Sequence, residues 1–178
     1  MSLLSYLELV DLIDAGVINA ELSRVNGSSI DITLDSIIRV EGVTGCVDLA
    51  KKENIATIEV DISNMGHSLY PNDFILASSA ETFNLPADIS CEYKLKSSMA
   101  RNGLEHLNAG WCDAWWSNSK LTLELKNMTR GHILLLTAGM PIGQMVFYRH
   151  APVPRDNGYA VLGQYNNQTK VTESKGIQ

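Results

Sequence analysis

The stretch Leu121-Thr122-Leu123-Glu124-Leu125 alternates leucine with polar residues, which is the pattern of a β-strand. Its three leucines share one face, where we expect the core, and Thr122 and Glu124 share the other. The polar face has two interpretations. If it meets solvent, Glu124 is an ordinary surface acid. If it lines the mouth of a barrel, Glu124 is a partly desolvated carboxylate of the kind that a proton shuttle requires.

The chain on both sides of this stretch continues the strand pattern. Alternation or short apolar runs predict further strands at residues 30–34, 55–62, 74–77, 133–136 and 144–147. Asn, Asp, Gly and Pro gather between them and predict turns at 26–27, 70–73 and 138–141. Many short strands with regular turns predict a mainly β fold, as a barrel or a jelly-roll-like sandwich.

Two short helices complete the expected elements. Residues 5–15 are amphipathic, and Gly16 is expected to end that helix. A second helix is expected from Ser98 to about Leu104. The polar tail, about 166–178, is predicted to be disordered on its own and to order over a ligand or a neighbouring subunit. With no linker or repeat, residues 1–178 are expected to form a single domain.

Composition narrows the classes of function. The net charge of −6 leaves no broad basic face, which argues against a nucleic-acid polymer as partner. Three widely spaced cysteines argue against a disulfide framework and predict a reducing, cytoplasmic location. The N-terminus lacks the pattern of a signal peptide, and no apolar run is long enough to predict a membrane span.

Two polar clusters accompany the central strand. Lys96-Ser97-Ser98-Met99-Ala100-Arg101 is either a helix start with a solvated arginine or a phosphate cradle, because Ser97 and Arg101 share a helical face. Asp113 lies among the chain's three tryptophans, which form either a core or trimer-contact cluster or the wall of a sugar site. The four histidines are scattered and lack the spacing of a zinc-deaminase motif.

In their order along nearly the whole chain, these segments resemble the dCTP deaminase branch of the dUTPase-like superfamily. The segments that carry the resemblance are 12–16, 25–34, 71–77, 81–86, 96–101, 109–113, 121–127 and 139–147. The resemblance implies a distorted β-barrel of jelly-roll type with a short N-terminal helix and one further short helix. It also implies a homotrimer whose active sites are shared between subunits.

The resemblance implies hydrolytic deamination of dCTP to dUTP and ammonia, feeding thymidylate synthesis. Glu124 matches the general base and acid, Ser97 and Arg101 would position the water and polarise the ring, and the Ala109 carbonyl would hold the amino group or water. A preorganised set of this kind supplies electrostatic catalysis. The family works without zinc, no residue is expected to bind a metal directly, and Mg²⁺ is expected to arrive bound to the triphosphate.

The resemblance also assigns nucleotide contacts. Lys96, Ser98 and Arg101 match triphosphate contacts, and Asp113 matches the residue that bonds the deoxyribose 3′-hydroxyl. Further contacts, through side chain or backbone, are expected from Met99, Ala100, Asn108, Trp111, Thr122, Leu123, Gln144, Tyr159, Gln164 and Gln168. The family also implies dTTP as an inhibitor.

Three short segments bear on which activity the resemblance implies. The family follows the sugar acid with Pro-Gly, where this chain has Ala114-Trp115, and its tail has Lys-Tyr, where this chain has Gln164-Tyr165. The Gly110-Trp111 context looks closer to bifunctional enzymes that release dUMP and pyrophosphate, which is the alternative function. A catalytically weak nucleotide-binding regulator is the third hypothesis, motivated by Trp115 and Gln164.

Overall fold

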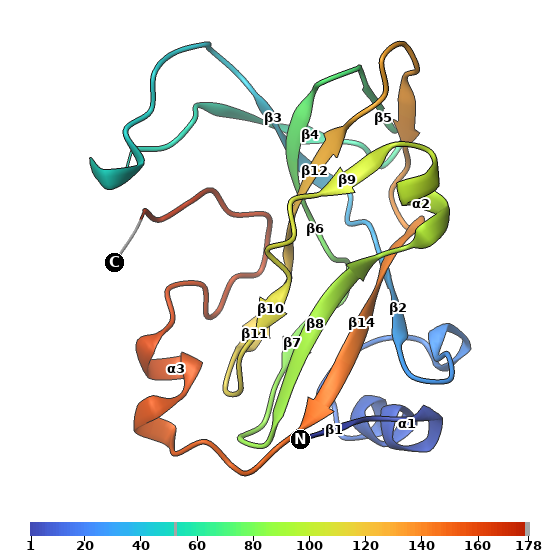
Figure 1. The fold of residues 1–178 in the computed structure, drawn as a ribbon, viewed down its shortest axis with the longest axis vertical. Coiled ribbons are helices and arrows are strands. Elements are labelled where there is room, and N and C mark those ends of the chain that lie inside the picture. Colours follow the sequence, from blue (N-terminus) through green and yellow to red (C-terminus); the bar gives the residue numbers. More distant parts are fainter. Residues whose placement is uncertain (52, 177–178) are drawn as a thin grey trace.

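The computed structural model describes residues 1–51 and 53–176, and strands dominate its ribbon (Figure 1). The strands are β1 (Ser2–Leu3), β2 (Ile30–Thr33), β3 (Ile37–Glu41), β4 (Thr57–Asp61), β5 (His67–Leu69), β6 (Phe74–Ser78), β7 (Phe83–Asn84), β8 (Ile89–Leu95), β9 (Leu104–His106), β10 (Trp111–Cys112), β11 (Ser117–Ser119), β12 (Thr122–Asn127), β13 (Leu134–Leu136) and β14 (Pro141–Arg149). The helices are α1 (Tyr6–Asp14), α2 (Ser97–Arg101) and α3 (Tyr159–Leu162), with 3₁₀ turns at Leu22–Arg24, Leu49–Lys51 and Arg155–Asn157.

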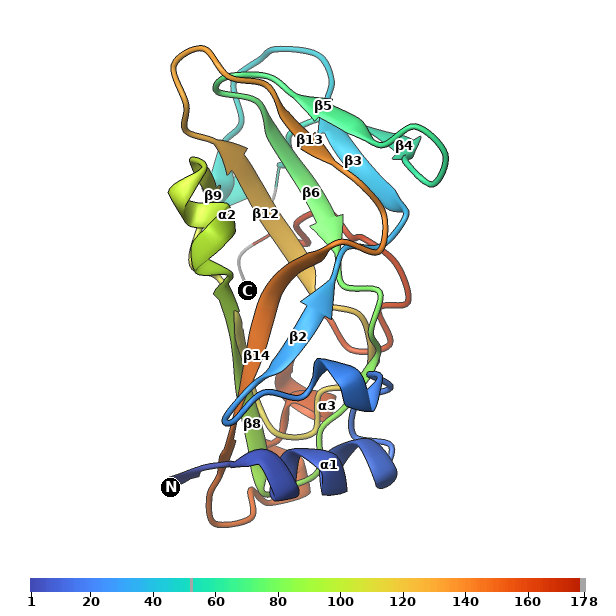
Figure 2. The same cartoon turned by 90° about the vertical axis from the view of Figure 1, so that its right-hand side faces the viewer.

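Two five-stranded antiparallel sheets make up most of the fold (Figure 2). The β14 sheet has the order β1-β14-β8-β10, and β2 also pairs with β14; the β12 sheet has the order β4-β3-β6-β12-β9. Two smaller ladders join β7 to β11 and β5 to β13. The mainly β expectation is confirmed. Among the described strands, however, the ladders stay separate and do not close into one continuous barrel.

One hydrophobic core lies between the sheets. Leu123 and Leu125 of β12 are fully buried in it, together with Met145 and Phe147 of β14. Because side chains alternate along a strand, Thr122 and Glu124 must then lie on the opposite face of β12. The leucine face of the central stretch is therefore the core face, as the alternation predicts.

Most predicted elements correspond to observed ones. The first helix is α1, which buries Leu9 and Leu12, and its start is fixed by the Ser5 N–H, which donates to Glu8 Oε2 at 3.0 Å. The six predicted strands correspond to β2, β4, β6, β12, β13 and β14. β14 begins at Pro141, earlier than predicted, because the expected turn at 138–141 ends where this strand starts pairing with β2.

The second helix is shorter than predicted. α2 ends at Arg101 because Gly103 adopts a φ of +86°, and Leu104 already begins β9. Strands β3 and β8 are absent from the prediction, although β8 alternates buried Ile89, Cys91 and Tyr93 with more polar residues. The short α3 was not predicted either.

The C-terminal tail packs against its own chain. Val171 is 2% exposed and Gln168 is 7% exposed, so the polar tail does possess an apolar anchor. Glu173 accepts hydrogen bonds from Thr57 and from Arg39, whose guanidinium lies 3.0 Å away. These contacts dock the described part of the tail, residues 166–176, on strands of its own chain, and the last two residues of the predicted tail lie outside the described ones. No described helix is both long and apolar enough to span a membrane.

Candidate active site

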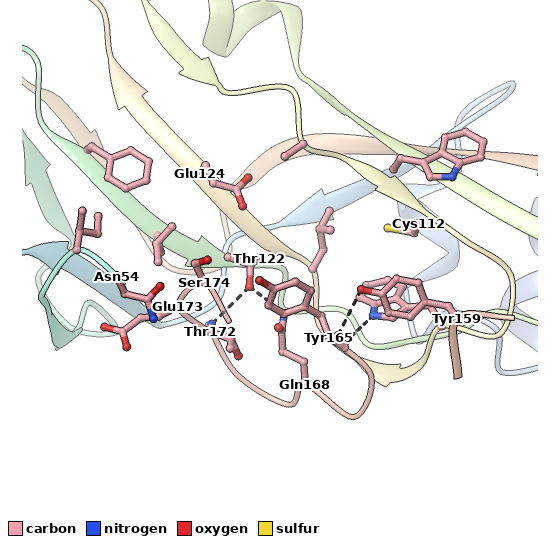
Figure 3. Close-up of a pocket in the computed structure, with 17 residues that line it drawn as sticks. Asn54, Cys112, Thr122, Glu124, Tyr159, Tyr165, Gln168, Thr172, Glu173 and Ser174 are labelled. Carbon is pink, nitrogen blue, oxygen red and sulfur yellow. Dashed lines mark hydrogen bonds between the residues drawn. The ribbon is translucent and has the colours of Figure 1, made fainter. Parts of the chain in front are cut away.

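A cavity of about 460 Å³ lies between the outer face of β6 and β12 and the C-terminal tail (Figure 3). Glu124 and Leu76 are register partners on these strands and both line it. The loop before β10 contributes Ala109, and residues from Tyr159 to Ser174 close the opposite side. The outer face of the central strand is therefore a site wall rather than open surface.

Glu124 reaches into this cavity from the middle of β12. Its side chain is 26% exposed, and its Oε2 atom is buried without a hydrogen bond. The nearest polar partner is Nε2 of His106, at 3.4 Å. Of the two interpretations of Glu124, the structure supports the partly desolvated carboxylate.

The wall beside Glu124 depends on a close approach of two backbones. Gly110 sits against Tyr93 of β8, and a Cβ at this position would lie 2.9 Å from the Tyr93 Cβ and 3.0 Å from its carbonyl oxygen. Only glycine fits there without a shift, so Ala109 and Trp111 are held on either side of a fixed point. Burial raises the pKa of the Tyr93 hydroxyl, which therefore stays protonated.

Tail residues complete the cavity. The Gln168 amide nitrogen donates to the Lys120 carbonyl at 2.9 Å and to the Thr122 hydroxyl at 2.8 Å, which leaves its buried Oε1 without a partner. The Tyr165 carbonyl accepts from the Trp116 indole at 2.9 Å (Figure 3). Burial raises the pKa of Tyr159, so its hydroxyl remains a donor. Glu124 and Gln168 thus offer free acceptors to a ligand.

Asp113 lies outside the main cavity and borders a second one of about 360 Å³. Its Oδ1 accepts the Trp111 indole N–H at 2.8 Å. The turn that follows keeps a shape suited to glycine, because Trp115 adopts a φ of +71°. The Trp115 indole is fixed by a 2.9 Å bond to the Val153 carbonyl and by packing against Gly158. The departure at Ala114-Trp115 is therefore accommodated with local strain.

The predicted phosphate residues form a separate group around α2. Ser97, Ser98 and Arg101 are exposed, line neither cavity, and have no side-chain partner within residues 1–51 and 53–176. Lys96 Nζ lies 2.7 Å from Asp31, and Gln144 accepts the Ser29 hydroxyl at 3.1 Å. Figure 1 places α2 and the C-terminal tail on opposite sides of β12. One chain therefore keeps its α2 group away from its own cavity.

The remaining residues that were expected to contact the nucleotide are divided among the cavity, the core and the α2 group. Trp111 lines the cavity, whereas Met99 packs against the core and the Leu123 side chain is fully buried in it. Asn108 adopts a φ of +62° in the loop leading to Ala109. Gln164 donates to the Gly176 carbonyl at 3.2 Å and does not line the cavity; Ala100 is exposed on α2.

Several residues of this site escaped the sequence analysis. Phe74, Leu76 and Tyr165 line the cavity, and His106 lies directly behind it. The alternation of β6 signals that Phe74 and Leu76 share a face, but nothing in the sequence pairs that face with β12. His106 belongs to no motif in the sequence, because the four histidines are scattered, and its place opposite Glu124 depends on the pairing of β9 with β12.

The sequence profile described as dCTP deaminase-like matches residues 3–150. The chain belongs to this family. Among curated relatives, "dCTP deaminase, dUMP-forming" of Methanosphaerula palustris is 33% identical over 174 residues, covering 94% of this chain and 92% of the relative. The protein of the same name from Mycobacterium sp. (strain KMS) is 37% identical over 175 residues, covering 93% and 91%.

A solved structure has the same fold. The 2′-deoxycytidine 5′-triphosphate deaminase from Agrobacterium tumefaciens superposes with a TM-score of 0.67 at 21% identity, over 83% of this chain and 48% of that chain. The likeness supports the dUTPase-like fold class that the ordered motifs imply. At this identity it bears on the fold alone.

Proposed function

We propose that the protein deaminates dCTP and releases dUMP and pyrophosphate. The observation that carries this proposal is Glu124, a partly desolvated carboxylate that faces the cavity from the position of the family's proton shuttle. The sequence favours dUTP as the end product, with dUMP as the alternative. The names of the curated relatives support that alternative, and so does the Gly110-Trp111 context.

The first reaction is hydrolysis at C4 of cytosine. A water oxygen bonds to C4, N3 gains a proton, the bond from C4 to the exocyclic nitrogen breaks, and ammonia leaves. Glu124 takes one proton from the water and passes it to N3. It then takes the proton of the new C4 hydroxyl and passes it to the amino group, so that ammonia leaves and C4 becomes a carbonyl. In the proposal, the Ala109 carbonyl, which lines the same cavity, holds the amino group or the water, while Ser97 and Arg101 of a neighbouring subunit polarise the ring.

The cavity offers contacts for the base, and Asp113, which borders the second cavity, offers one for the sugar. Gln168 Oε1 is a fixed acceptor without a partner. Residues 122 and 123 of β12 pair with β6 on one edge but have no strand partner on the other, because β9 pairs only with residues 125–127. Asp113 would bond the 3′-hydroxyl through the capacity its Trp111 bond leaves free, since a carboxylate accepts several hydrogen bonds. This arrangement suits a deoxynucleoside.

Binding of the triphosphate requires the residues around α2, which form the second polar group. We propose a homotrimer in which Lys96, Ser98 and Arg101 of a neighbouring subunit meet the triphosphate, because one chain's α2 group and cavity lie apart. Gln144 belongs to the same phosphate-directed group. Mg²⁺ enters as part of the substrate, the metal chelate of the triphosphate. Water then attacks the α-phosphorus of dUTP. Pyrophosphate is the leaving group, and dUMP is the other product. A cytoplasmic location remains part of the proposal.

The test is a product analysis with purified protein, dCTP and Mg²⁺, resolved by chromatography with ammonia measured in parallel. We expect ammonia, dUMP and pyrophosphate in equal amounts. dUTP without dUMP would reduce the function to deamination alone. Unchanged dCTP with tight nucleotide binding would favour the regulator instead, for which the Gln164 departure is the remaining argument.

Glu124→Gln supplies the mechanistic test. Removing the proton shuttle should lower the deamination kcat by about 1,000-fold or more while dCTP still binds. Glu105→Gln is the matched control, because Glu105 is an exposed acid on the adjacent strand β9. Full turnover by Glu124→Gln would contradict the assignment.

A further inference from the structure

His106 is a buried histidine that no step above uses. It ends β9, its side chain is 4% exposed, and its Nε2 lies 3.4 Å from Glu124 Oε2. The ring rests on Tyr93, with ring centroids 4.6 Å apart and planes tilted by 58°. The imidazole is thus held directly behind the carboxylate that faces the cavity.

Both facing atoms lack a hydrogen bond. His106 Nε2 and Glu124 Oε2 are two of four buried side-chain atoms in the described residues that have no partner. An unsatisfied buried polar atom is costly, and native proteins keep such atoms mainly where function requires them. A distance of 3.4 Å is slightly too long for a good N–H···O bond, and catalytic hydrogen bonds are often long before substrate binds.

A purely structural role does not explain why a polar imidazole occupies this buried position. The His106 Nε2 atom has no hydrogen bond to another described group, and the imidazole packs against the tilted ring of Tyr93. An aromatic hydrocarbon of similar size would fill the same space without a desolvation cost. The imidazole nitrogen gains a partner only through Glu124.

We propose that His106 is a positioning residue for Glu124: its Nε2–H donates to Glu124 Oε2 and leaves the other oxygen, Oε1, directed at the reacting base. The catalytic meaning of this contact rests on the proposed deamination. One carboxylate oxygen is anchored and the other is free to move protons. The geometry resembles the general arrangement in which a catalytic group is oriented by a third residue.

Kinetics of two His106 variants test the role. His106→Phe keeps the ring volume without a donor, and His106→Gln keeps an N–H group. We expect Phe to lower the deamination kcat by about 30-fold or more with KM within about threefold, and Gln to recover about tenfold of that loss. His132→Phe, an exposed histidine far from the cavity, is the control. Wild-type kcat in His106→Phe, or equal losses in Phe and Gln, overturns the proposal.

A spectroscopic readout separates this inference from the proposed function. Long-range ¹H–¹⁵N spectra of the wild-type protein should show His106 protonated at Nε2, with a signal that His106→Gln abolishes and Glu124→Gln shifts. An Nε2 signal unaffected by Glu124→Gln, or an unprotonated Nε2, overturns the contact whatever the activity. If wild-type protein leaves dCTP unchanged while the spectra show the contact, the proposed function fails and the contact stands.

Discussion

Trp115 carries a backbone conformation that large side chains rarely adopt. Its φ of +71° stands where the resemblance predicts glycine, and its indole is held by the Val153 carbonyl and by packing against Gly158. The chain therefore stabilises the turn after Asp113 by side-chain anchoring instead of backbone freedom.

A pair of substitutions measures that exchange. Trp115→Gly and Trp115→Ala both remove the ring and its hydrogen bond, but only glycine relieves the positive φ. We therefore expect both to be less stable than wild type, and the alanine variant to be about 1 kcal/mol less stable than the glycine variant. Urea denaturation of the two proteins gives the difference. Equal stabilities would mean that the turn relaxes in the variants.

Lys175 places a positive charge beside Gln164, a position where the resemblance predicts a lysine. Its ammonium donates to the Gln164 carbonyl and lies 5.1 Å from the centre of the Tyr165 ring, next to the cavity residue Ser174. Lys175→Gln should raise the KM for dCTP about threefold with little change in kcat, as expected for a lost phosphate-directed charge. Lys170→Gln is the matched control, and equal effects would remove the special role of Lys175.

At the scale of single residues, the sequence indicates which residue types lie on each face of a strand more reliably than which residues they contact. Alternation in the central strand places Glu124 opposite the core, and the structure shows that this face lines a cavity. The pairing of Glu124 with His106, and of Gln168 with Thr122, joins residues distant in the chain or in different elements. Local patterns carry no information about such contacts, which is why His106 was overlooked.

The C-terminal tail is the element whose behaviour departs most from local expectation. It is polar, yet Val171 anchors it and Glu173 joins it to β3 and β4 through Arg39 and Thr57. The Thr57 hydrogen bond, followed by Arg39, lowers the pKa of Glu173. A lowered pKa means that this contact stabilises the docked tail at neutral pH and is lost as the pH falls through that lowered value.

Loosening this contact should expose the cavity. In Glu173→Gln the amide no longer pairs with the Arg39 guanidinium, so we expect faster trypsin cleavage after Lys170 and a KM for dCTP raised about threefold. Acidification should speed cleavage of the wild-type tail, whereas the variant should respond little. The rates are read by mass spectrometry with an acid-tolerant protease for the low-pH series. A tail equally protected in both proteins would contradict the role of Glu173.

Strands with strong periodicity were predictable as elements, but their partners were not. Residues 74–77 and 121–125 were recognised separately, whereas their pairing as β6 and β12 creates the cavity floor. The Ser, Glu and Lys positions of β8 weaken its β-propensity, although pairing with β14 on one side and β10 on the other makes it an inner strand of its sheet. Pairing between distant segments therefore determined which strands form and which strands are neighbours, and local propensity alone does not predict this.

For the whole molecule, the separation of the cavity from the α2 group decides how a site is assembled. The α2 helix, which carries the exposed Ser97, Ser98 and Arg101, lies on one side of β12 (Figure 1), and the C-terminal tail, which lines the cavity together with Glu124, lies on the other. A triphosphate bound to one chain would leave its charges without these partners. In the proposed homotrimer, each cavity would meet the α2 group of a neighbouring subunit.

Mixed assemblies can distinguish a shared site from a site within one chain. Glu124→Gln and Arg101→Ala should each be inactive, and each keeps the residue that the other lacks. If a site combines Glu124 of one subunit with Arg101 of the next, random mixing restores roughly a quarter of the wild-type activity, because that fraction of sites is complete. If both residues act within one chain, no mixed site is complete and activity stays at background. Co-refolding the two variants, with each alone as control, gives the measurement, and a solution mass of three times 19.5 kDa should accompany the recovered activity.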